Sequence, residues 1–286
     1  MKTELRPLLD FGLQESVALM NHGFSDYVVH IELTLPMFLN MTRTESIDLG
    51  SSRIIVLDDE AAGVALIARR GWTSRLAAMS IVPASRGRGG GRAAMSLLLA
   101  EAAARGDHSM ALEVIESNTP AVRLYEACGF TTERRLVGYE GAFAPMNEAA
   151  DLHEVDIREV ARLVTAHGWD NLPWQVSGES LSALTPPSQA WRLDDAYLVI
   201  SNPAAEQVAI RSLIVRPEAR RQGQAARLLK AVIAKYPTKK WFVSALCPEE
   251  IGGVFEKVGF QRSSLVQLQM RIEFNSSIGG INHDSA

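Results

Sequence analysis

The residues with the clearest chemical meaning form the run RGRGGGR, Arg86 to Arg92. An apolar stretch typical of a strand precedes this run, and a long Ala- and Leu-rich helical stretch follows it. Backbone N–H groups therefore converge at a helix N-terminus, where glycine lets the chain approach an anion closely and arginine adds positive charge. The pattern predicts either a cradle for a pyrophosphate or a flexible turn with solvated arginines.

Other glycine loops fit this run less well. A Walker A loop requires GK[ST] at its end, where this sequence has GGGR. A dinucleotide-binding GxGxxG that starts at Gly87 would need glycine or alanine in place of Arg92. An RGG-type RNA-binding segment lies in low-complexity sequence, whereas this run lies between a strand and an apolar helix.

A second polar pattern follows in NTPAVRLYEACGF. Asn118 is placed to cap a helix that has Pro120 in its first turn and that ends at Gly129. Apolar positions on one side of this helix form a stripe at helical spacing. The stripe consists of Ala121, Leu124, Tyr125 and Cys128. By itself, Tyr125 would be interpreted as a core tyrosine whose hydroxyl finds any convenient partner.

The same order of elements occurs twice. Residues 78–130 predict strand, glycine loop, helix, strand and helix, and this order recurs from AIRSLIV to the segment that ends at Phe260. Arg86 recurs as Arg220, and Gly129 recurs as Gly259. A repeat of this length indicates a duplicated domain rather than a solenoid.

The length of 286 residues also favours two domains. We place the first at residues 1–143 and the second at 150–274, with a flexible tail at 275–286. Residues 10–48 and 156–184 are predicted to form a pair of helices in front of each sheet. The fold class is α/β (α+β), with a mixed, mostly antiparallel sheet flanked by helices in each domain.

Taken together, SIVPASRGRGGG, LEVIESN and NTPAVRLYEACGF resemble the GNAT (Gcn5-related) N-acetyltransferase superfamily, in a tandem two-domain form. The RxxGxG/A loop of that family matches Arg86, Gly89 and Gly91. The resemblance covers about the last half of the first domain, and a weaker copy covers the same part of the second. It implies acetyl-CoA (CoA) as a cosubstrate and a primary amine as the acyl acceptor.

The resemblance also implies roles for individual residues. Tyr125 matches the tyrosine that acts as general acid near the CoA sulfur. Glu113 matches a glutamate that ribosomal-protein alanine acetyltransferases use as general base, although a strand-end carboxylate in solvent would give the same pattern. The remaining matched positions would bind the cosubstrate. These are Met79, Ile81, Arg86, Gly87, Arg88, Gly89, Gly90, Gly91, Arg92 and Asn118.

The second copy departs from the family pattern at both polar positions near the thioester. Phe255 stands where the first copy has Tyr125, and Pro248 stands where it has Asn118. The loop glycine and the apolar stripe survive. We therefore expect the C-terminal domain to be non-catalytic and the N-terminal domain to carry the reaction.

Composition limits the partners. The net charge of -4 gives no general attraction to nucleic acid or to an anionic membrane. The two cysteines and six histidines lack the spacing of a metal site, so no metal is predicted. The start of the chain lacks the apolar core of a signal peptide, which predicts a cytoplasmic protein. A homodimer is compatible with the sequence.

Several polar and aromatic residues ahead of the loop are typical either of an acceptor pocket or of a front helix packed on the sheet. They are Phe24, Tyr27, His30, Glu32, Phe38 and Trp72. For the whole chain, the sequence predicts an N-acetyltransferase that acts on a small-molecule or peptide amine. The alternative is an acyl-CoA-binding regulatory or interaction protein without turnover.

Overall fold

The computed structural model describes residues 1–29, 32–145 and 150–274. The twelve strands within these ranges pair in the order β1-β2-β3-β4-β5-β12-β6-β11-β10-β9-β8-β7. Their bounds are β1 (Thr3–Pro7), β2 (Arg53–Leu57), β3 (Glu60–Arg70), β4 (Thr73–Ile81), β5 (Ser109–Ile115), β6 (Thr131–Ala142), β7 (His153–Val155), β8 (Gln189–Leu193), β9 (Ala196–Ile200), β10 (Gln207–Val215), β11 (Lys240–Pro248) and β12 (Gln261–Glu273).

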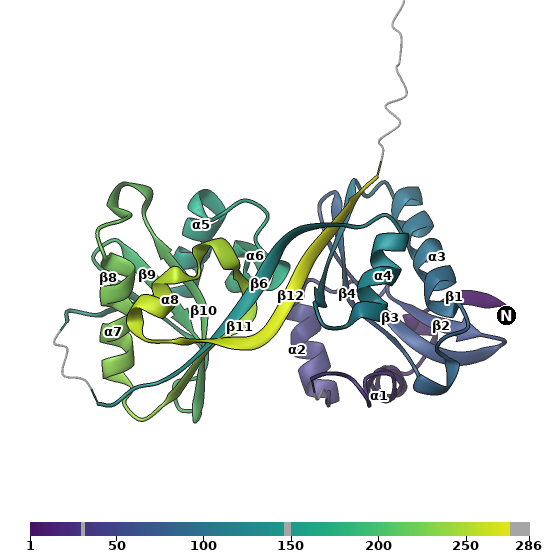
Figure 1. The fold of residues 1–286 in the computed structure, drawn as a ribbon, viewed down its shortest axis with the longest axis horizontal. Coiled ribbons are helices and arrows are strands. Elements are labelled where there is room, and N and C mark those ends of the chain that lie inside the picture. Colours follow the sequence, from purple (N-terminus) through teal and green to yellow (C-terminus); the bar gives the residue numbers. More distant parts are fainter. Residues whose placement is uncertain (30–31, 146–149, 275–286) are drawn as a thin grey trace, which may run out of the picture.

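Eight α-helices of the described ranges flank these strands (Figure 1). They are α1 (Leu13–Gly23), α2 (Leu35–Glu45), α3 (Gly90–Ala104), α4 (Thr119–Ala127), α5 (Ile157–His167), α6 (Gly178–Ser182), α7 (Gln224–Lys235) and α8 (Gly253–Val258). None of the helices in these ranges is long and apolar enough to cross a membrane.

In the first half of the chain, residues 1–145, helices cover both faces of the sheet. Side chains alternate in direction along a strand, and here both sets are apolar. On β2, Ile55 and Leu57 pack with α3 and α4 in one core cluster. Ile54 and Val56 pack with α1 and α2 in another. Within each cluster the apolar side chains are almost completely buried, which provides the main stabilisation of this half.

The second half repeats this layering. On β9, Leu198 and Ile200 pack with α7 and α8. Tyr197 and Val199 pack with α5 and α6. The predicted α/β class and the mixed, mostly antiparallel pairing are therefore confirmed, since β4–β5 and β10–β11 are parallel and the other pairs are antiparallel.

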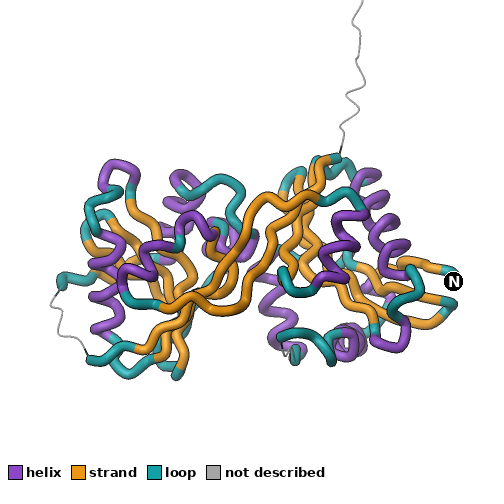
Figure 2. Tube along the Cα trace, viewed as in Figure 1, coloured by secondary structure: helices purple, strands orange, loops and turns teal. Residues whose placement is uncertain are grey.

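The two halves exchange their last strands. β12 pairs with β5 of the first half over seven residues, from Gln267–Ile115 to Glu273–Ser109. β6 in turn pairs with β11 of the second half. Figure 1 shows β6 and β12 running side by side from one lobe to the other, and they also pair with each other. In the trace of Figure 2 these strands form the connection between the lobes.

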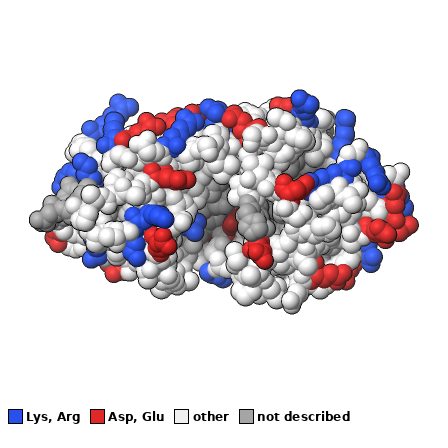
Figure 3. Space-filling model, turned by 60° about the horizontal axis from the view of Figure 1, so that its bottom comes forward, with Lys and Arg blue, Asp and Glu red and all other residues white. Residues whose placement is uncertain are grey.

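The predicted domain boundary between residues 143 and 150 follows β6, and residues 146–149 lie outside the described ranges. The predicted tail, residues 275–286, also lies outside them. The division into 1–143 and 150–274 stays a prediction, and the strand exchange means that each half contributes a strand to the sheet beside the other. Figure 3 shows cationic and anionic side chains interspersed on one face of the molecule, which is hollowed at its middle.

Candidate functional site

The first half contains a gap between two parallel strands. β4 and β5 pair only at Thr73–Ser109, Ser74–Met110 and Arg75–Ala111. Beyond this point both strands continue for several residues without pairing to each other. On its other side β4 remains paired with β3 as far as Ile81. The backbone of the last part of β4 is therefore open toward β5, and Met79 and Ile81 lie on this open part.

The glycine loop follows directly after β4. Gly87 and Gly89 have φ of 75° and 85°, a left-handed conformation that L side chains adopt only with strain. Gly89 caps the N-terminus of α3. A Cβ on Gly90 would come within 2.9 Å of Leu57, so this glycine lets α3 pack closely on β2. As at every helix N-terminus, the first backbone N–H groups of α3 have no acceptor within their own helix.

The arginines of the loop behave differently from one another. Arg88 and Arg92 are exposed. Arg86 instead folds back, and its guanidinium donates to the carbonyls of Ile81 and Gly23 and pairs with Asp26 at 2.8 Å. Arg86 thus fixes the end of α1 to the end of β4, and its side chain acts as a clamp.

Helix α4 forms as the sequence indicates. The Asn118 side chain accepts from the Ala121 N–H, and Gly129 follows the last turn with φ of 95°. Tyr125 is 9% exposed and packs edge-on against Phe130, with ring centroids 5.9 Å apart. Burial raises the pKa of the Tyr125 hydroxyl, and the nearby Tyr27 and Cys128 raise it further. The hydroxyl therefore stays protonated at neutral pH.

Tyr27 is one of the residues that the sequence assigns either to an acceptor pocket or to a front helix. It lies in the segment after α1, and its ring packs against Phe24. Burial raises the pKa of Tyr27, while an interaction with the Asn118 side chain partly offsets this rise. Its only signal was membership of the aromatic group before the loop. Of that group, Phe38 is buried in the core and Trp72 stacks on His108 at the surface.

His30 lies outside the described ranges. Glu113 is not a carboxylate in solvent, because its side chain is 3% exposed and pairs with Arg75 at 2.7 Å. Arg75 also pairs with Glu45 at 2.9 Å. Burial lowers the pKa of Arg75, but Glu113 and Glu45 outweigh this effect and raise it above the ordinary value.

The predicted acid and the predicted base lie on opposite faces of β5. Leu112 and Val114 share the core cluster of Tyr125, so Glu113 between them points to the other face. Met79 and Ile81 pack on the same cluster as Tyr125, and a Cβ on Gly91 would lie 3.5 Å from Ile81. Glu113 is thus not in contact with Tyr125.

The second half repeats the gap and the clamp. β10 and β11 pair only from Gln207–Lys240 to Ala209–Phe242. Gly223 caps α7 with φ of 78°. Arg220 donates to the carbonyls of Val215 and His167, just as Arg86 does in the first half. These matches extend the repeat from sequence to geometry.

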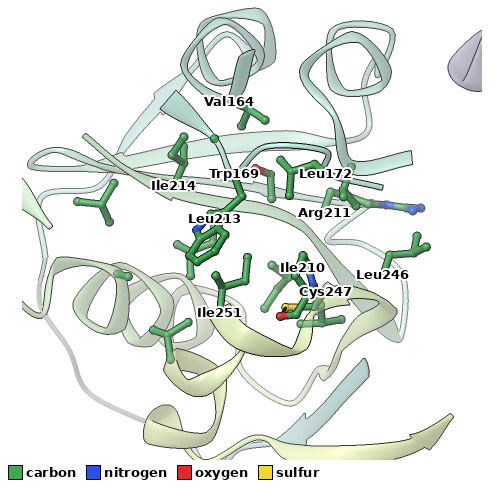
Figure 4. A pocket seen from close by; sticks show the side chains of 18 of the residues that line it. Val164, Trp169, Leu172, Ile210, Arg211, Leu213, Ile214, Leu246, Cys247 and Ile251 are labelled. Carbon is green, nitrogen blue, oxygen red and sulfur yellow. Dashed lines mark hydrogen bonds between the residues drawn. The ribbon is translucent and has the colours of Figure 1, made fainter. Parts of the chain in front are cut away.

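A cavity of about 440 Å³ lies between β10, β11 and α8 (Figure 4). Figure 4 shows Leu213 and Ile251 near its middle, while Arg211 extends away from them. Phe255 and Pro248 line this cavity where the first half has a tyrosine and an asparagine. Burial also raises the pKa of the lining Cys247 to about 12, so its thiol is not ionised at neutral pH.

Comparison with known proteins agrees with this geometry. Residues 22–130 match the family model described as Acetyltransferase (GNAT) family. A GCN5-related N-acetyltransferase from Sphaerobacter thermophilus has a similar structure, with 17% identity, 95% of each chain covered and a TM-score of 0.69. A tandem GNAT protein from the clavulanic acid biosynthesis pathway has 14% identity, a TM-score of 0.61, and coverage of 95% of this chain and 98% of its own.

A putative acetyltransferase from Pyrococcus horikoshii is also similar, with 13% identity, a TM-score of 0.64, and coverage of 96% of this chain and 89% of its own. No curated protein matches the sequence. At these identities the solved structures establish the fold, while the family match covers the loop, Glu113 and Tyr125. Residues 22–130 thus match the GNAT acetyltransferase family model, and the whole chain has the fold of GNAT proteins, a tandem GNAT protein among them.

Proposed function

We propose that the protein is an acetyl-CoA-dependent N-acetyltransferase whose reaction takes place in the first half. The observation that carries this proposal is the gap between β4 and β5, which leads from the glycine loop to Tyr125 and Asn118. The residues present fit acetyl-CoA, because left-handed glycines and helix N–H groups suit a pyrophosphate and the open backbone of β4 suits an amide-containing arm.

In the proposed reaction a neutral amine attacks the thioester carbonyl, a C–N bond forms, and the C–S bond breaks. Glu113, directly or through water, takes the proton that the amine loses. Tyr125 gives its proton to the leaving thiolate. An α-amine with a pKa near ~8 costs about 1.4 kcal/mol to deprotonate at neutral pH, whereas a lysine amine costs more than about 4 kcal/mol. A strong base therefore matters most for lysine-like acceptors.

The environment of Tyr125 supports the role of acid over that of base. An ordinary tyrosine of pKa ~10 protonates a thiolate of pKa ~8.5 at a cost of about 2 kcal/mol. Burial raises the pKa of Tyr125, so the proton is held more tightly and full transfer costs more. Tyr125 consequently contributes most as a hydrogen-bond donor whose proton moves late, when negative charge on sulfur has developed.

The proposal is tested by following thiol release from acetyl-CoA with a panel of acceptors that spans amino acids, polyamines, aminoglycosides and peptides. We expect release with at least one primary amine and a loss of most of it in Tyr125→Phe. Absence of release across the panel, with a folded protein that binds acetyl-CoA, would favour the second candidate.

That second candidate is an acyl-CoA-binding protein without turnover. The cavity in the second half favours it, because a gap of the same form is lined by Phe255 and Pro248 and so lacks both polar groups. Binding measured by calorimetry without thiol release would support this function. In either case we propose a small-molecule or peptide amine, or a CoA thioester, as the partner, and a cytoplasmic location.

A further inference from the structure

Gln175 belongs to the second half, yet its side chain reaches Glu113 in the first. Its Nε2 donates to Oε2 of Glu113 at 3.1 Å. Arg75 donates to the same oxygen through Nε at 2.7 Å. Both donors therefore hold one oxygen of the carboxylate, and no donor to the other oxygen is found among the residues that the structure describes.

The turn that carries Gln175 is fixed to the first half by its neighbour. The indole N–H of Trp174 donates to the carbonyl of Glu45 at 2.7 Å. The guanidinium of Arg70 lies 4.2 Å from the centre of the Trp174 ring and donates to the hydroxyls of Ser177 and Ser180 at 2.8 Å each. Burial lowers the pKa of Arg70 to about 10, so it remains charged at neutral pH.

Because of these contacts, the position of Gln175 is determined by the packing of the second half on the first. Trp174 is buried in the core cluster of α1 and α2, although it belongs to the second half. A shift of this turn would therefore disturb several partners of the first half at once. Gln175 has little freedom to move away from Glu113.

We propose that Gln175 is a positioning residue that holds one oxygen of the Glu113 carboxylate and so orients it, which means that the second half completes the site of the first. The inference rests on the proposed function, in which Glu113 takes the proton of the amine. Two donors on one oxygen fix the plane of the carboxylate and leave the other oxygen to accept the N–H of an acceptor amine.

The alternative is that Gln175 only helps to hold the two halves together. The pH dependence of the reaction distinguishes this role from the positioning of Glu113. Arg75 on β4 pairs with Glu113 and with Glu45 on α2, and Arg70 and Arg211 act on Glu45. Arg271 on β12 and Arg134 on β6 lie on the same face of the sheet as Glu113. None of these changes in a Gln175→Met variant. A carboxylate that loses a neutral donor takes up a proton at higher pH, whereas loosening of a joint only lowers stability.

Gln175→Met is a suitable variant because methionine has nearly the shape of glutamine and no N–H donor. The Oε1 of Gln175 is buried without a hydrogen-bond partner, so its removal also removes an unfavourable group. We expect the variant to fold. Gln207→Met is the matched control, since Gln207 is exposed at the start of β10 in the same half.

The experiment measures kcat, KM and their pH dependence in the parent and both variants, together with the Tm. In Gln175→Met we expect kcat to fall about tenfold, KM for acetyl-CoA to stay within about twofold, and the acid limb of kcat/KM to move to higher pH. Gln207→Met should behave like the parent. A Gln175→Met profile that coincides with the parent profile overturns the proposal, whatever the Tm.

A readout without turnover keeps this inference separate from the proposed function. In ¹³C NMR of the full chain, with Glu113→Gln used to assign the signal, the Glu113 carboxyl should begin to protonate at higher pH in Gln175→Met than in the parent. If the parent shows no thiol release but this difference is present, the proposed function fails and Gln175 still controls Glu113. If the two carboxyl titrations coincide, the positioning role is wrong.

Discussion

Tyr125 and Phe255 occupy equivalent places on α4 and α8, and they differ by one hydroxyl group. Tyr125 is 9% exposed and Phe255 is 5% exposed. Their rings lie 5.9 Å from Phe130 and 5.7 Å from Phe260, respectively. Because the second half packs equally well with a phenylalanine, packing does not require the Tyr125 hydroxyl, and its use must be sought in chemistry.

Tyr125→Phe should therefore leave the fold intact and reduce turnover. We expect kcat to fall by about 10² to 10⁴, with little change in affinity for acetyl-CoA, because the proton is needed only as the thiolate develops. Thiol release and calorimetric titration measure the two quantities. A kcat within about threefold of the parent would show that Tyr125 is a packing residue and that water or another group is the acid.

The raised pKa of Tyr125 also predicts the alkaline behaviour of the enzyme. Burial favours the neutral hydroxyl in the folded state. The contribution of Tyr125 to the free energy of unfolding is therefore fully present below its unfolded pKa of about 10, and it is lost as the pH rises through the folded pKa. We expect no alkaline decline in kcat from this group below about pH 10. A limb near pH 8 that disappears in Tyr125→Phe would contradict this assignment.

At the glycine loop, backbone shape should matter more than charge. Both halves keep glycine at the helix cap, Gly89 and Gly223, whereas Gly87 is replaced by Arg221, which has φ of 62°. Gly89→Val should weaken binding of CoA strongly, because a β-branched residue resists the left-handed conformation. Arg88→Ala should weaken it only modestly. The reverse order in calorimetric titration would mean that side chains, not backbone amides, hold the cosubstrate.

Helix caps and helix ends can be predicted from the sequence, whereas contacts between distant segments cannot. The cap at Asn118 and the helix stop at Gly129 depend on neighbouring residues, and the structure confirms both. The contact of Glu113 with Arg75 and Gln175 depends on tertiary packing between distant segments. No local pattern contains that information, so a buried ion pair was indistinguishable from an exposed carboxylate.

Helix α8 should contribute to stability rather than to chemistry. Phe255 packs against Phe260 and against Tyr139, whose ring lies 5.2 Å away on β6. Phe255→Ala should lower the free energy of unfolding by about 3 to 5 kcal/mol, because it leaves a cavity among these rings. Chemical denaturation of the full chain measures this loss. A change below about 1 kcal/mol would mean that the site collapses to fill the space.

For the molecule as a whole, the exchange of β6 and β12 ties the halves together. Seven residue pairs join β12 to β5, and β6 pairs with β11 and β12. The repeat was predictable because both copies carry the same motifs. The exchange was not, because no local sequence pattern specifies which of two distant strands pairs with the open edge of β5.

Two separately expressed chains, residues 1–145 and 150–286, should therefore assemble when produced together. Each carries the strand that extends the sheet of the other, so co-purification and a single unfolding transition are expected. Residues 1–145 produced alone should expose the edge of β5 and aggregate. If this fragment instead remains soluble and monomeric with a cooperative transition, the first half does not depend on β12.

The position of β12 also determines when the protein can fold during its synthesis. Domains generally fold in order as they leave the ribosome, with the N-terminal domain first. Here the strand that pairs with β5, Gln261–Glu273, follows every other strand and helix of the second half. The sheet of the first half therefore keeps an unpaired β5 edge until these residues have been translated, and a product that terminates before them lacks a complete version of either half.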